Sequence, residues 1–264
     1  MKVFIATDLE GVCGVYSFQQ TRDGHGSAPN LGALRLQREE VNAAVRGAFA
    51  GGATQVVADG LHGHGGPLDL GSFDERLEMI LGGHNQVESV WQAIAEAQFD
   101  AVFLLGYHAR ANTPGGVLCH TQSSKALNNV WINGRLVGEA EQSAIAFGAM
   151  GAPVVLVTGD DHTCREAREF LGDQPVTVEV KRGLARQCAW SPAPKRAWQL
   201  IEDGAREAMG RVAEAKPYEQ EFPVTIRWQF LDSGALDRFS GKGARIDSQI
   251  LEKTVHRPQD ILWP

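Results

Sequence analysis

Short apolar runs alternate with longer amphipathic stretches along most of the chain. Four of these runs have the length of buried strands and end at polar residues: 3–7, 54–58, 101–106 and 154–158. Between them, apolar residues recur at helical spacing over residues 33–50 and 87–97. Strands that alternate with helices form right-handed βαβ units. We therefore predict a three-layer α/β fold in which helices cover both faces of a mainly parallel sheet.

The pattern changes after a Ser-Pro-Ala-Pro segment at residues 191–194. A long helix is expected over residues 195–214, and residues 223–230 alternate between apolar and polar as in a half-exposed strand. We therefore predict two parts, an α/β metal-binding catalytic core over residues 1–192 and a smaller C-terminal α+β subdomain over residues 193–264.

Composition excludes several classes of protein. The 264 residues carry a formal net charge of −7 without clusters of Lys and Arg, so we expect no nucleic acid partner. No apolar run approaches the roughly 20 residues of a membrane helix, and the stretch before Asp8 is too short for a signal-peptide core. The four cysteines are isolated and form no CxxC pair, which indicates reduced thiols. These features predict a cytoplasmic protein without a membrane partner.

Histidines and acidic residues follow each of the four apolar runs. They are Asp8 and Glu10 after the first run, Asp59, His62 and His64 after the second, His108 after the third, and Asp160, Asp161 and His162 after the fourth. The carboxyl ends of parallel strands share one edge of a sheet, where ligands bind. Because carboxylates and imidazoles are ligands of zinc and similar ions, the pattern predicts a metal site at this edge.

Each of these residues also has a simpler interpretation. Asp8 and Glu10 lie two residues apart and can reach the same side of an extended backbone, but they also fit a solvated strand end or a helix N-cap. His62 and His64 lie in a glycine-rich loop whose backbone can approach a ligand closely, and only one of them needs to bind. His108 could be a hydrogen-bonded core histidine.

Three further positions are candidates with alternatives. His120 lies in a stretch without periodicity, residues 109–129, and is either a general base or without a role. Glu139 lies in the first turn of an expected helix and is either a ligand or a partner of the helix dipole. Asp160 and Asp161 could anchor the amine of a substrate, but they also fit the N-terminal cap of the next helix.

Five segments of the chain resemble motifs of one known family and occur in its order. They are MKVFIATDLEGVCGV (1–15), DGLHG (59–63), GYHARANTPGGVLCHT (106–121), INGRLVGE (132–139) and VTGDD (157–161). From residue 1 to about 192 the chain resembles the D-aminopeptidase family of binuclear zinc peptidases, the DppA type. The resemblance implies a metal-dependent aminopeptidase with two zinc ions per chain that releases N-terminal residues, D-amino acids in this family, from short peptides. It also implies a ring-shaped homo-oligomer.

Matched motif by motif, the resemblance implies metal ligands at Asp8, Glu10, His62, His108 and Glu139 and a catalytic histidine at His120. The chain departs from the family in the second motif, where Gly60 and Leu61 separate the aspartate from His62 and the family has one residue. His62 fits the spacing to the following glycines better than His64, which stays the alternative. The loop between the third-motif histidines is one residue longer, and the C-terminal third carries almost no family motif.

Charge balance supports two metals. Three carboxylates and one hydroxide match the charge of two zinc ions. Five protein ligands suit two ions if one carboxylate bridges them, and Asp8 is our choice for the bridge. A bridged metal pair activates a water molecule and polarises a carbonyl oxygen. His120 would then transfer protons or stabilise the oxyanion.

Two other functions stay open. A haloacid-dehalogenase-like phosphohydrolase would explain Asp8-x-Glu10 after an N-terminal strand, but it needs an aspartate in place of Glu10 and gives His62 and His108 no role. A non-catalytic, zinc-stabilised peptide-binding protein would have a closed four-coordinate site.

Overall fold

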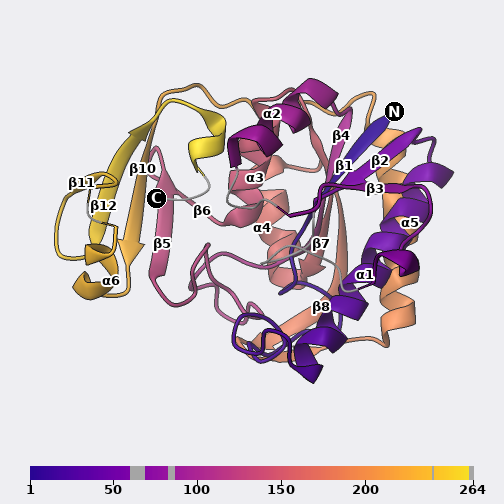
Figure 1. Cartoon of the computed structure of the whole chain (residues 1–264), viewed down its shortest axis with the longest axis horizontal. Coiled ribbons are helices and arrows are strands. Elements are labelled where there is room, and N and C mark those ends of the chain that lie inside the picture. The colour runs from indigo at the N-terminus through magenta and orange to yellow at the C-terminus, as the bar shows by residue number, and fades with distance from the viewer. Residues whose placement is uncertain (60–68, 83–86, 240, 262–264) are drawn as a thin grey trace.

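Seven strands form a mainly parallel sheet in the computed structural model, which describes residues 1–59, 69–82, 87–239 and 241–261 (Figure 1). The strands are β1 (Lys2–Thr7), β2 (Gln55–Ala58), β3 (Leu77–Met79), β4 (Ala101–Tyr107), β7 (Val154–Asp160), β8 (Val176–Ala185) and β9 (Cys188–Trp190). They lie in the order β3-β2-β1-β4-β7-β8-β9, and β9 alone among them runs antiparallel to its neighbour. The prediction of a mainly parallel sheet is confirmed.

Helices cover both faces of this sheet (Figure 1). One face carries α1 (Ala28–Ala50) and α5 (Pro194–Arg211), and the other carries α2 (Val87–Ala97), α3 (Glu139–Gly148) and α4 (Asp161–Leu171). Side chains of a strand point alternately to the two faces, so Val3 and Ile5 of β1 pack with α1 and α5, whereas Phe4 packs with Phe147 of α3. This double burial explains the continuous apolar runs. None of the helices that the structure describes is long and apolar enough to cross a membrane.

A second, smaller sheet is antiparallel and lies beyond α3 (Figure 1). Its strands, in the order β11-β12-β10-β5-β6, are β5 (Leu127–Ile132), β6 (Arg135–Val137), β10 (Val224–Phe230), β11 (Ala244–Arg245) and β12 (Ile250–Val255). A short helix, α6 (Ser233–Asp237), follows β10, and the 3₁₀ turns η1 (Leu70–Ser72) and η2 (Pro258–Ile261) complete the described elements. Trp228 and Phe230 of β10 are fully buried in the same core cluster as α3, so α3 is packed between the two sheets.

The fold packs together chain segments from either side of residue 192. Helix α5 lies after that residue but packs against α1 on the large sheet. Strands β5 and β6 lie before it but pair with β10 in the small sheet. A single cut at residue 192 therefore does not separate the sheets, and the division into two domains there stays a prediction.

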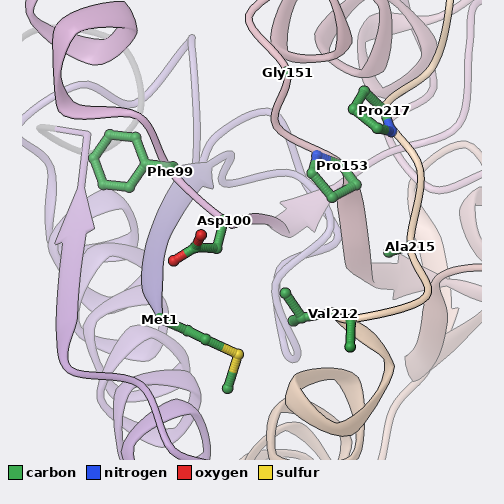
Figure 2. A pocket seen from close by; sticks show the side chains of 9 residues that line it. Met1, Phe99, Asp100, Gly151, Pro153, Val212, Ala215 and Pro217 are labelled. Carbon is green, nitrogen blue, oxygen red and sulfur yellow. The ribbon is translucent and has the colours of Figure 1, made fainter.

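The two ends of the large sheet differ in character. A pocket of about 450 Å³ opens at the amino ends of the strands and is lined by Met1, Phe99, Asp100, Pro153 and Val212 among others (Figure 2). Among the residues that line it, Asp100 has the single ionisable side chain. The histidines and acidic residues predicted to bind metal follow the carboxyl ends of β1 and β4, at the opposite end of these strands.

Candidate metal centre

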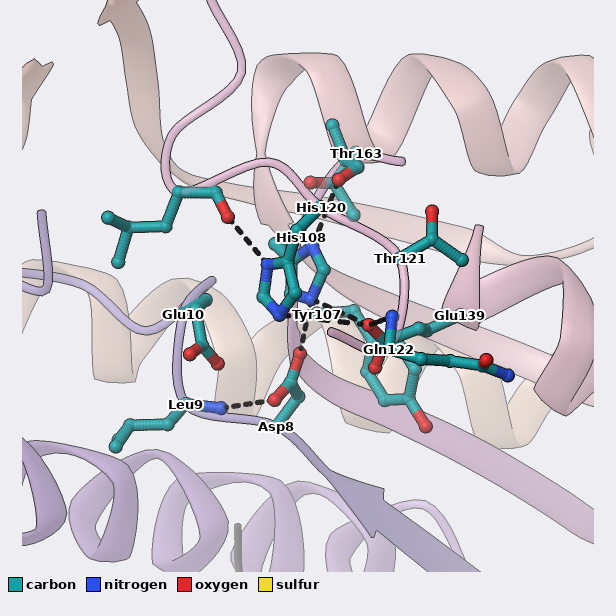
Figure 3. A network of polar contacts seen from close by, with 12 residues as sticks. Asp8, Leu9, Glu10, Tyr107, His108, His120, Thr121, Gln122, Glu139 and Thr163 are labelled. Carbon is teal, nitrogen blue, oxygen red and sulfur yellow. Dashed lines mark hydrogen bonds and ion pairs between the residues drawn. The ribbon is translucent and has the colours of Figure 1, made fainter. Parts of the chain in front are cut away.

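Five of the six predicted site residues meet at the carboxyl edge of the large sheet (Figure 3). Asp8 directly follows β1, Glu10 lies two residues further on, His108 follows β4, His120 lies between β4 and β5, and Glu139 is the first residue of α3. Ligand atoms of Asp8, Glu10 and His108 lie within 4.8 Å of one another, and so do those of His108, His120 and Glu139. The sixth residue, His62, and its alternative His64 lie outside the described residues.

Two glycines allow the loop after β1 to lie directly on the end of β4. Gly11 donates a backbone hydrogen bond to Gly106 O (2.7 Å). A Cβ atom at Gly11 would lie 1.8 Å from Tyr107 O, and one at Gly106, where φ is +70°, would lie 2.3 Å from Asp8 O. No other residue fits such close approach of two backbones. This contact brings the carboxylates of the β1 loop to the histidine at the end of β4.

His108 lies at the centre of the cluster. Its Nδ1–H donates to Ala109 O (2.9 Å), so Nε2 faces the carboxylates, at 3.3 Å from Asp8 Oδ2 and 3.3 Å from Glu139 Oε1. Burial alone would lower the pKa of His108, but the negative charges of Glu139 and Asp8 outweigh it and raise the pKa well above its usual value. A proton or a metal cation is therefore favoured between Nε2 and these oxygens.

His120 stacks on His108, with ring centroids 4.0 Å apart and an interplanar angle of 9°. Its Nδ1–H donates to Leu118 O (2.7 Å), and its Nε2 lies 3.9 Å from Glu139 Oε1. Burial, together with the positive charge of His108, lowers the pKa of His120 to about 4. The ring is therefore neutral at pH 7 and carries its lone pair on Nε2. Its position suits either a proton acceptor or a metal ligand.

The carboxylates respond differently to the same surroundings. Burial and the neighbouring charge of Glu10 raise the pKa of Asp8 well above its usual value. Burial would also raise the pKa of Glu139, but the charge of His108 and a hydrogen bond from Gln122 N (2.6 Å) lower it to about 2. Three carboxylates this close repel one another, and a bound cation would relieve the repulsion.

The loop that carries His120 is held in a strained conformation. Leu118 and Gln122 have positive φ angles of 52° and 62°, which non-glycine residues rarely adopt. Leu118 supplies the carbonyl that orients His120, and Gln122 supplies the N–H that binds Glu139. Strain of this kind persists where the surroundings enforce it, as is common at functional sites.

The remaining acidic candidates have structural partners. Asp59 accepts hydrogen bonds from the backbone and hydroxyl of Thr7, the latter at 2.6 Å. Asp160 is the N-cap of α4, accepting from Thr163 N (2.8 Å) with one oxygen and from Val117 N (2.7 Å) with the other. Asp161 accepts from Gly183 N (2.7 Å). The capping interpretation of Asp160 therefore agrees with its hydrogen bonds.

Sequence reasoning missed a buried cation next to the site. Lys181 of β8 is 3% exposed, and its Nζ donates to the carbonyl oxygens of Glu10, Val12 and Val15. In the sequence, Lys181 simply continues the alternation of apolar and polar residues that begins at Val176, which would place it on the exposed side of the strand with Glu179. That pattern does not reveal that the lysine is buried.

The donor set of this cluster fits zinc. Imidazole nitrogens and carboxylate oxygens are common zinc ligands, whereas a magnesium site is built of oxygen ligands and would leave the imidazoles without a role. His108 Nε2 is fully buried and, within the described part of the chain, makes no hydrogen bond of good geometry, although two carboxylate oxygens lie 3.3 Å away. A cation bound there would give this nitrogen a partner.

Comparisons with known proteins identify a family model and relatives that this chain is similar to. The model of peptidase family M55, described as D-aminopeptidase, matches residues 1–260. The D-aminopeptidase of Bacillus subtilis (strain 168) is 29% identical over 237 residues, which cover 89% of this chain and 83% of that protein. A solved structure, the Zn-dependent D-aminopeptidase DppA from Bacillus subtilis, a self-compartmentalizing protease, matches with a TM-score of 0.88 and 24% identity over 99% of this chain and 94% of that one. The last comparison shows that the fold is shared.

Proposed function

The chain belongs to the D-aminopeptidase family M55, and we propose that its buried cluster holds two zinc ions with which it releases N-terminal D-amino acids from short peptides. The observation that carries the proposal is the position of His108 Nε2, buried and 3.3 Å from a carboxylate oxygen of both Asp8 and Glu139. This arrangement is unfavourable for a neutral imidazole and favourable once a cation lies between the three groups.

Asp8, Glu10, His108 and Glu139 would hold the metals together with His62, and Asp8 is our candidate for the bridging carboxylate. When bound, zinc would lower the pKa of a water molecule and polarise the carbonyl of the scissile peptide bond. The described ligands come from three elements, the ends of β1 and β4 and the start of α3, so the fold preorganises them.

His120 is proposed as the catalytic histidine. Its Nδ1–H is fixed by Leu118 O, so the neutral ring offers Nε2 as a proton acceptor. It would take a proton from the attacking water and return it to the amine that leaves when the peptide C–N bond breaks. Peptide and water are thereby converted to an amino acid and a shortened peptide.

Assembly and location belong to the proposal as well. The related Bacillus subtilis DppA is a self-compartmentalizing protease, so we expect this chain to form a homo-oligomer, and we propose a ring. All four cysteines are free thiols, which supports a cytoplasmic location.

Metal analysis combined with hydrolysis of D-alanyl and L-alanyl dipeptides, before and after EDTA, tests the proposal. We expect two zinc ions per chain and EDTA-sensitive release of D-alanine. Release of L-alanine alone would keep the chemistry and refute the proposed stereospecificity. Hydrolysis that survives complete metal removal, or release of phosphate from a phosphoester in its place, would refute the metallopeptidase mechanism.

A further inference from the structure

A buried lysine binds the loop that carries one of the proposed metal ligands. Lys181 Nζ lies 2.5 Å from Glu10 O, 2.9 Å from Val12 O and 2.6 Å from Val15 O. An ammonium group has three donors, and all three are directed at backbone carbonyls of the segment between β1 and α1. One of these carbonyls belongs to Glu10 itself.

A β-bulge directs this side chain inward. In the pairing of β7 with β8, Gly159 lies opposite Glu179 and Asp160 lies opposite Lys181, so Val180 is an extra residue in β8. As a result both Val180 and Lys181 are buried, although neighbouring residues of a regular strand would face opposite sides. Bulges re-aim side chains in this way and are frequent beside active sites.

Two carboxylates compensate the buried charge. Asp160 and Glu40 both favour the charged form of Lys181, although burial lowers its pKa to about 8. Glu40 of α1 also accepts a hydrogen bond from Cys13 N (2.8 Å), within the same loop. The loop is therefore held by a cation from β8 and a carboxylate from α1. A buried ion of this kind is costly, and an apolar side chain could fill the same space.

We propose that Lys181 is a positioning residue for the metal centre: by fixing the carbonyl of Glu10, it directs the Glu10 carboxylate toward the cation shared with Asp8 and His108. This inference rests on the proposed function. Without the ammonium, the buried carbonyls of Glu10 and Val15 would lose the hydrogen bond from Lys181, and Val12 O would keep only its bond from Val15 N (3.1 Å). The loop would have to turn to find other partners, and the Glu10 side chain would move with its backbone.

A charge-balanced double variant tests this role. Lys181→Met combined with Glu40→Gln removes one positive and one negative charge, and the amide oxygen introduced by Glu40→Gln can still accept the hydrogen bond from Cys13 N. Glu40→Gln alone and Lys195→Met, at an exposed lysine of α5, are the matched controls. Zinc affinity of the apo protein is measured by competition with a chromophoric chelator, and the geometry of the site by the visible spectrum of the cobalt-loaded protein.

We expect the double variant to bind zinc about 10–100-fold more weakly than the wild type and to show an altered cobalt spectrum, because lost support of a metal ligand typically has this effect. Both controls should match the wild type. If the double variant is folded by circular dichroism and binds zinc with unchanged affinity and spectrum, Lys181 only stabilises the fold and the inference fails. If the double variant does not fold, Lys181→Arg decides in the same way, since a planar guanidinium cannot serve three converging carbonyls. A wild-type protein that binds no zinc would refute the proposed function instead.

Discussion

His108 couples the protonation states of the whole site. Its Nδ1 is fixed by Ala109 O, its ring stacks on His120, and its Nε2 faces Asp8 and Glu139. A positive charge at this position, whether from a proton or from a metal ion, favours ionised Glu139 and neutral His120. The same residue therefore favours the protonation states that the proposed ligand Glu139 and the proposed base His120 require.

Replacement of His120 distinguishes its two roles. If it is the proton carrier that we propose, His120→Asn should lower kcat by about 10²–10⁴-fold while the zinc content stays that of the wild type. Steady-state kinetics and metal analysis of the same preparation check this. A loss of bound zinc in the variant would instead identify His120 as a ligand.

Glu40 makes a testable contribution to the pH dependence of stability. Burial raises its pKa from about 4.5 to about 7 in the folded chain. Between these values the folded state binds more protons than the unfolded state, so the free energy of unfolding falls as the pH rises through this window. Glu40→Gln should remove this loss, on the order of 2 kcal/mol between pH 5 and pH 7.5. Urea unfolding of both apo proteins at the two pH values measures the difference, and equal pH slopes would contradict it.

At the scale of elements, the helical spacing of apolar residues was sufficient to predict helices α1 and α2. Helix 87–97 agrees with α2 at both ends, and helix 33–50 is extended to residue 28 because Ser27 caps α1 and Pro29 suits its first turn. Asn133-Gly134 joins β5 to β6 with the positive φ angles of a hairpin turn. Partners of these strands could not be predicted, because β5 pairs with β10, almost a hundred residues later in the chain.

Gly106 lets the end of β4 lie against the backbone of Asp8, and its replacement tests the importance of this contact. Gly106→Ala would place a Cβ atom 2.3 Å from Asp8 O at a φ of +70°, so we expect both a loss of stability above about 2 kcal/mol and weaker zinc binding. Gly134→Ala is the matched control, since its φ is +80° but nothing lies within 4 Å of the new atom. The control should lose only about 1–2 kcal/mol and keep its zinc affinity. Equal effects of the two variants in urea unfolding would show that the contact with Asp8 is unimportant.

For the whole molecule, the predicted family and fold class are confirmed, and Asp8, Glu10 and His108 follow the ends of parallel strands. The topology explains this success, because strand order alone brings the ends of β1 and β4 together. It also explains what was missed. The small sheet combines segments from both sides of residue 192. Lys181 reaches the site through a bulge in β8. Neither feature can be predicted from local periodicity.

Repulsion between the buried carboxylates predicts that removing one of them stabilises the apo protein but weakens its zinc binding. Because burial and Glu10 disfavour the ionised form of Asp8, its carboxylate destabilises the apo fold at neutral pH. Asp8→Asn should therefore raise the melting temperature of the apo protein by a few degrees. It should also gain less than the wild type from added zinc, since the stabilisation by a ligand that binds the folded state grows with the logarithm of its affinity. Thermal unfolding of both proteins, with EDTA and with a fixed excess of zinc, measures the two effects. A variant that is less stable than the wild type in EDTA and equally stabilised by zinc would show that Asp8 serves the fold, not the metal.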